Sequence, residues 1–163
     1  MADLARFRRA QDERHSGFAA ALSELRAGRK TGHWIWYVFP QLAGLGMSEM
    51  SRVYGIADVD EAIDYVRDPV LRGRLLSAAT AVLEQQRAGT PLSRLMGSSI
   101  DVVKLLSSMT LFGAIAHRLQ QTDPTDEGSR LAEIAADILK AAEAEGYPRC
   151  EFTLRALASS NRW

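Results

Sequence analysis

Hydrophobic residues recur at helical spacing through most of the chain. Apolar positions three or four residues apart form one face of a helix. The segments with this pattern are 18–27, 48–54, 58–67, 69–88, 90–97, 98–116, 131–145 and 152–157. No interior segment alternates with the two-residue period of a strand. The pattern predicts one compact all-α domain over residues 1–163, with about six to eight helices.

Short polar side chains mark the expected starts of these helices. Serine and aspartate favour this position because they accept a hydrogen bond from a backbone N–H of the first turn. The predicted caps are Ser48, Asp58, Asp68 and Ser98, and Thr90-Pro91 repeats the start signal of Asp68-Pro69. Glycines at positions 28, 55, 89, 97 and 146 mark expected ends.

The segment near 99–116 predicts the central buried helix. A helix that is apolar on nearly all sides is buried. At about 100° per residue, Asp101, Lys104, Ser107 and Ser108 nevertheless share one arc, whereas Thr110 points the opposite way. We expect this polar arc to emerge from the core over the first half of the helix. It is either a solvated edge with an Asp–Lys pair or part of a site.

Aromatic side chains are concentrated between two glycine-containing segments, over residues 34–39. Trp34 and Trp36 lie there, after His33 and before Pro40 and Gln41. Rings with polar groups at their edge are typical of a pocket wall. A core plug whose indole N–H groups are satisfied locally fits the same composition. The sequence leaves both interpretations open.

The same stretch resembles a known family. From Gly28 to Gly46 it reads G-x-K-x-x-H-W-x-W-x-x-F-P-Q-x-x-G-L-G, which is similar to the signature of the domain of unknown function 1810 family. Further similar strings are 18–25 (FAAALSEL), 54–56 (YGI), 60–65 (DEAIDY), 69–75, and Asp101-x-x-Lys104 with 107–112 (SSMTLF). The resemblance implies a small, all-helical, cytoplasmic bacterial protein, and it implies no activity. Some members carry the label calpastatin, but no inhibitory repeat occurs in this chain.

The charge balance limits the classes of partner. Twenty basic and twenty acidic side chains cancel, so the basic footprint of a nucleic-acid-binding protein is absent and we expect no such partner. Short basic clusters such as 6–9 (RFRR) are interpreted as solvated surface. No run of about 18 uncharged apolar residues occurs, so no membrane span is expected.

Cysteine use and the N-terminal segment indicate the compartment. Cys150 is the single cysteine, which excludes an internal disulfide framework and is typical of a reducing compartment. MADLARFRRAQDERHS lacks the apolar core of a signal peptide. We therefore expect a cytoplasmic protein. The resemblance to the family also implies an aspartate shortly before Thr153-Leu154, but this chain has Cys150 at that place. Any family site that uses the aspartate is therefore altered in this chain.

Standard catalytic signatures and metal-ligand spacings are absent, so we expect no metal and no cofactor. We predict a small-molecule site for an anionic ligand with a flat or apolar part, such as a nucleotide. The predicted catalytic residues are His33 and Asp101, because either side chain can move a proton. The predicted ligand-binding residues, drawn from the family-like strings, are Lys30, Trp34, Trp36, Gln41, Tyr54, Lys104, Ser107, Ser108 and Thr110. Hydrolysis without a cofactor is the expected reaction, and the rival hypothesis is a non-catalytic structural or protein-interaction module.

Overall fold

A computed structural model describes residues 3–160 of the chain. Ten helices occur in this range, with no β-sheet. They are α1 (Ala5–Gln11), α2 (Phe18–Arg26), α3 (Ile35–Val38), α4 (Glu49–Tyr54), α5 (Val59–Arg67), α6 (Pro69–Arg87), α7 (Leu92–Met96), α8 (Ser99–Leu119), α9 (Asp126–Ala144) and α10 (Glu151–Ala158). The predicted all-α class is confirmed.

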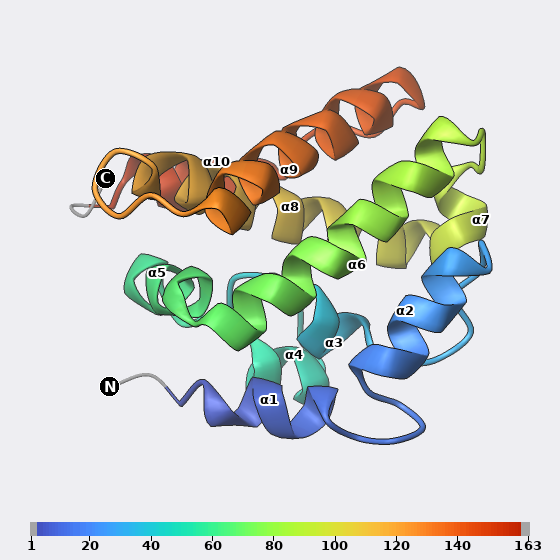
Figure 1. Cartoon of the computed structure of the whole chain (residues 1–163), viewed down its shortest axis with the longest axis horizontal. Coiled ribbons are helices and arrows are strands. Elements are labelled where there is room, and N and C mark those ends of the chain that lie inside the picture. The colour runs from blue at the N-terminus through green and yellow to red at the C-terminus, as the bar shows by residue number, and fades with distance from the viewer. Residues whose placement is uncertain (1–2, 161–163) are drawn as a thin grey trace.

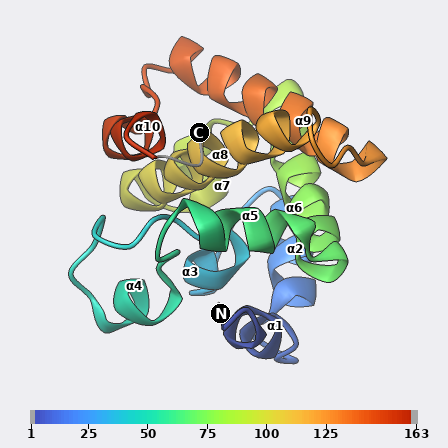
Figure 2. The ribbon, with the colours of Figure 1, turned by 90° about the vertical axis from the view of Figure 1, so that its left-hand side faces the viewer.

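Helix α8 is the central element of the fold. It packs against α9, α5, α7 and α10, and Figure 2 shows it between α9 on one side and α5 on the other. Helix α6 crosses the molecule and contacts α9 and α2 (Figure 1). The apolar sequence of α8 follows from this position, because a helix surrounded by other helices buries nearly every face.

The short helices α1, α3 and α4 lie below α8 in Figure 1. Helix α3 contacts α1, α4, α6 and α8. The segments that flank α4 meet at an isolated parallel bridge between Leu42 and Ile56. There, Ala43 N donates to Ile56 O and Ile56 N donates to Gln41 O, each at 2.8 Å. This bridge fixes the loop after α3 beside the start of α5.

The structure has more helices than the six to eight that we expected. The additional ones are α1, in the basic N-terminal segment, and α3, inside the aromatic stretch. Neither has a side-chain cap at its N-terminus, and α3 is a single turn. Both lack the start signals that sequence analysis uses, so packing against the core, not local preference, accounts for them.

By length and composition alone, α8 passes the test for a membrane-crossing helix. In its most apolar 18-residue window, 61 % is buried inside the protein. The core helix of a globular protein has the same composition because its neighbours replace water on all sides. The packing of α8 therefore accounts for its apolar character.

Candidate functional site

A pocket of about 350 Å³ lies between the segment after α3 and the first half of α8. Its volume is at the small end of the range for ligand sites, about 300–1,000 Å³. The wall combines apolar side chains with an ammonium, an amide and two hydroxyls. It is formed by Trp36, Gln41, Leu45, Gly46, Met47, Ser48, Ile100, Val103, Lys104 and Ser107. The structure thus brings four of the predicted ligand-binding residues together: Trp36, Gln41, Lys104 and Ser107.

Lys104 joins the two sides of this pocket. Its Nζ lies 3.8 Å from the centroid of the Trp36 ring and 3.3 Å from Asp101 Oδ1. The side chain is only 18 % exposed, so the aromatic face and the carboxylate replace most of its water. An ammonium group has three N–H donors, and the bond to Asp101 uses one of them.

A second lysine, Lys30, contacts the carboxylate of Asp101 as well. Lys30 Nζ lies 2.8 Å from Asp101 Oδ2, and its side chain is 5 % exposed. It also donates to Gly32 O at 2.5 Å. Asp101 therefore bridges two ammonium groups, one on each oxygen. Two positive charges and one negative charge leave this group of three side chains with a net charge of +1.

The two tryptophans have different roles. Trp34 is fully buried, and its Nε1 donates to Glu24 Oε1 at 3.0 Å, so it is the core plug. Trp36 is half-buried and forms part of the pocket wall. Partial burial opposes ionisation of Glu24, but hydrogen bonds from Gly32 N, Thr31 N and Trp34 outweigh it and lower the pKa of the carboxyl.

Gln41 is the most unusual polar residue of the pocket. It is 8 % exposed and lines the pocket. Within residues 3–160, no hydrogen bond to its side-chain amide occurs, and only its backbone oxygen is bonded, to Ile56 N. The amide atoms are not fully enclosed, and they open onto the pocket. The Gln41 amide thus has both donor and acceptor capacity for a bound molecule.

The three hydroxyl residues of α8 are not equivalent. Ser107 lines the pocket, and its Oγ donates to Val103 O at 3.0 Å. Ser108 is fully buried, and its Oγ has no hydrogen-bond partner in the described chain. Thr110 lies away from the site, on a separate pocket beside α9 and α10, and it accepts a hydrogen bond from Cys150 N at 3.4 Å. Only Ser107 of the three lines the candidate site.

The remaining predicted residues lie outside the pocket wall. His33 is exposed and makes no hydrogen bond, ion pair or ring contact with the part of the chain that the structure describes. Tyr54 packs on Tyr37 and Phe7, with ring centroids 5.2 and 6.1 Å apart. Asp101 contacts Lys104 but does not itself line the pocket. Neither predicted catalytic residue is therefore part of the wall.

A family model for proteins of unknown function, DUF1810, matches residues 1–125 of the chain. The chain belongs to the DUF1810 family. The matched region contains every residue of the pocket wall and both lysines that meet Asp101.

A solved structure extends this assignment beyond the matched region. The chain is 34 % identical to the conserved hypothetical protein Rv1873 from Mycobacterium tuberculosis, over 97 % of this chain and 98 % of that one, with a TM-score of 0.73. That similarity includes the C-terminal helices that the family model does not reach. No curated protein matches the chain.

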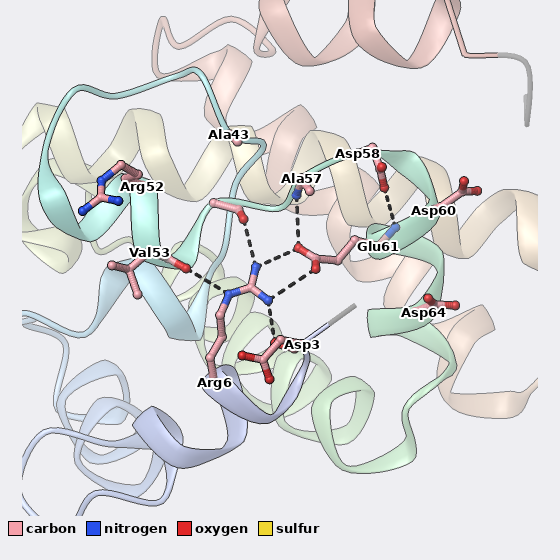
Figure 3. A pocket seen from close by; sticks show the side chains of 11 residues that line it. Asp3, Arg6, Ala43, Arg52, Val53, Ala57, Asp58, Asp60, Glu61 and Asp64 are labelled. Carbon is pink, nitrogen blue, oxygen red and sulfur yellow. Dashed lines mark hydrogen bonds and ion pairs between the residues drawn. The ribbon is translucent and has the colours of Figure 1, made fainter. Parts of the chain in front are cut away.

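The family-matching region also contains a larger pocket of about 660 Å³, centred on Arg6 (Figure 3). All five N–H donors of this guanidinium are bonded: to Val53 O, Gly55 O and Asp3 O, and to both oxygens of Glu61, the nearest at 2.7 Å. A fully bonded arginine has no donor left for a ligand. Arg6 therefore holds α1, α4 and α5 together. Its pocket is lined by five carboxylate residues and only two arginines, so its net charge repels an anion.

The role of Arg6 has no signature in the sequence. We interpreted the RFRR cluster as solvated surface, but the Arg6 side chain is only 16 % exposed. The distant partner Glu61 gave no local signal, because ion pairs between segments leave no spacing pattern. In the range that the structure describes, no group of three or more His, Cys, Asp or Glu side chains is arranged to hold a metal ion.

Proposed function

We propose that the pocket between α3 and α8 binds a small organic anion with a flat or apolar part. The observation that carries the proposal is the side-chain amide of Gln41, which makes no hydrogen bond within residues 3–160 and opens onto a wall that also holds Lys104. The N–H and C=O groups of this amide can therefore bond a ligand in place of water.

The chemistry of the wall favours this class of ligand. Lys104 retains unused N–H donors beside Trp36, so it can hold a negatively charged group. Leu45, Ile100 and Val103 offer apolar surface to the rest of the molecule. Sites for small molecules commonly combine a mainly apolar wall with few polar groups. Nucleotides, the class expected from the sequence, belong in any screen.

Hydrolysis stays a prediction that the geometry of the pocket does not strengthen. The wall contains no histidine, cysteine, aspartate or glutamate. A general base must reach the proton that it removes directly or through one water. Both oxygens of Asp101 already contact lysines. Binding, and not catalysis, is therefore the activity that we propose.

One observation favours a non-catalytic interaction module as the second candidate. Met47, Ile100 and Val103 border the pocket, and their exposed fractions are 103 %, 67 % and 54 %. Exposed apolar side chains that lie together are a feature of protein-binding surfaces. Such a module would bind a protein partner through these side chains and would not depend on the charge of Lys104.

A ligand screen with a matched pair of variants tests the proposal. Adenosine monophosphate, glucose 6-phosphate and phenylacetate are added, and binding is measured by thermal shift and calorimetry. Lys104→Met keeps the packing of the stem and removes the charge, so affinity for a bound anion should fall about tenfold or more. Lys140→Met, on the exposed face of α9, is the control and should bind as the parent does. If no anion binds, or if both variants bind equally, the proposal is wrong.

A further inference from the structure

We infer that the pocket selects a monocarboxylate with an apolar body over a phosphate ester. This inference rests on the proposed function and specifies the ligand class of the same site. It comes from three features: the net charge beside the pocket, the number of free donors in its wall, and the apolar character of the rest of the wall.

The net charge beside the pocket matches a single negative charge. Lys104 is the one charged residue in the wall. It contacts Asp101 directly, and Asp101 in turn contacts Lys30. Lys30 is almost fully buried, so water screens this group weakly. Its net charge of +1 is neutralised by one carboxylate. A phosphate monoester carries about −1.5 to −2 near neutral pH and would leave excess negative charge next to Asp101.

The free donors also match a carboxylate. Lys104 supplies unused N–H groups and Gln41 supplies an unpaired amide, so each can donate to one of the two carboxylate oxygens. Ser107 has already donated its proton to Val103 O, and Ser48 is an exposed residue that caps α4. A phosphate has three terminal oxygens, so one of them would have no donor group of its own in the inner wall.

The remainder of the wall suits an apolar body. Trp36, Leu45, Met47, Ile100 and Val103 supply most of its surface. Apart from Ser107, whose oxygen can still accept one hydrogen bond, the wall has no further buried polar side chain to bind the hydroxyl groups of a sugar. An aryl or alkyl group would cover side chains that are otherwise exposed to water, and burying such surface is favourable.

Three probes of nearly equal size test the inference directly. Phenylacetate, phenyl phosphate and phenylacetamide are compared by calorimetry on the full chain at pH 8, where phenyl phosphate is a dianion because its second pKa is about 6. We expect phenylacetate to bind at least about tenfold more tightly than either of the others, as for a lost charge-assisted hydrogen bond. Tighter binding of phenyl phosphate would overturn the inference and leave the proposed function standing. A failure of phenylacetate and phenyl phosphate to bind would also overturn the inference, and the proposed function itself would be wrong only if adenosine monophosphate and glucose 6-phosphate failed as well.

Variants of the lysine–carboxylate group provide the second arm. Asp101→Asn raises its net charge from +1 to +2, so the preference should shift toward phenyl phosphate by about tenfold. The double variant Lys30→Met/Asp101→Asn returns the charge to +1 and removes the unpaired buried lysine, so the preference for phenylacetate should return even where the single variant folds poorly. If the double variant prefers phenyl phosphate, net charge does not set the selectivity and the inference is wrong.

Discussion

The ammonium group of Lys104 lies over the face of Trp36, 3.8 Å from the ring centroid, and ties α8 to the aromatic segment around α3. A lysine is rarely this enclosed unless it is paired. Here the aromatic face and Asp101 both stabilise the charge, and Asp101 is in turn held by Lys30. One wall of the pocket therefore depends on electrostatic contacts between segments that lie far apart in the sequence.

The two tryptophans should differ sharply in their contribution to stability. Trp34→Ala removes a fully buried ring and should cost about 3–5 kcal/mol of unfolding free energy. Trp36→Ala removes a half-buried ring and should cost no more than about 1.5 kcal/mol, because only part of its surface is taken from water. Urea denaturation of both variants provides the measurement. Equal losses would show that the rings do not have separate core and wall roles.

The sequence was most informative where structure is local. The predicted caps Ser48, Asp58, Asp68 and Ser98 each accept a backbone hydrogen bond from the first turn, because a cap and its partner are three residues apart or fewer. Thr90 is an exception: α7 begins after Pro91, and the Thr90 hydroxyl donates to Gln85. The arc of α8 that carries Lys104 and Ser107 was also predictable, since helical spacing fixes it.

Relationships between distant segments could not be predicted in the same way. Periodicity cannot distinguish Trp34 from Trp36 in an uninterrupted apolar run, and only packing assigns one to the core. The Asp101–Lys104 pair follows from helical spacing, but the shorter contact from Lys30 to Asp101 joins two separate segments. Ser108 and Ser107 are neighbours on the same arc, yet only Ser107 lines the pocket.

Lys30 and Asp101 should be strongly coupled. Asp101→Asn leaves a buried lysine without its carboxylate and should cost about 3 kcal/mol, the low end for a broken buried pair because Asp101 keeps 17 % exposure. A double-mutant cycle with Lys30→Met, followed by chemical denaturation, should give a coupling of about 1–3 kcal/mol. Additive losses would mean that the contact does not stabilise the fold.

Glu24 should make stability depend on pH in the acid range. Its folded-state pKa lies below the ordinary value of 4.5, so its contribution is complete above that pH and is lost as the pH falls through the folded-state pKa. Glu24→Gln should therefore be less stable than the parent at pH 7, and the difference should shrink below about pH 4.5. Thermal melts at several pH values measure it. A difference that does not change with pH would contradict the hydrogen bonds assigned to the carboxylate.

Arg6 should be a structural residue despite its position in a basic cluster. Arg6→Met leaves Glu61 buried without its guanidinium partner and should cost about 3 kcal/mol. Arg9→Met is the matched control, because Arg9 is 70 % exposed, and its cost should stay within about 0.5 kcal/mol. Denaturation midpoints compare them. Similar losses at both positions would show that the positive charge of the cluster, and not the hydrogen bonds of Arg6, stabilises the fold.

Gln41 and Gln11 should respond oppositely to the same substitution, although both are buried, at 8 % and 4 % exposure. Gln11 bonds Tyr37 O at 2.8 Å, Tyr65 Oη at 3.2 Å and Arg74 Nη1 at 3.2 Å. Gln11→Met leaves buried partners unsatisfied and should cost about 1–3 kcal/mol.

The amide of Gln41 makes no such bond within residues 3–160. Gln41→Met removes an amide that makes no hydrogen bond within this range and replaces it with an apolar side chain of similar size, so stability should stay equal or rise, while affinity for phenylacetate falls. Urea denaturation and calorimetry on the same samples separate the two effects. A loss of stability as large as that of Gln11→Met would show that the fold already satisfies this amide. Gln41 would then have no unused hydrogen-bonding capacity for a ligand, and the main support for the pocket as a binding site would be lost.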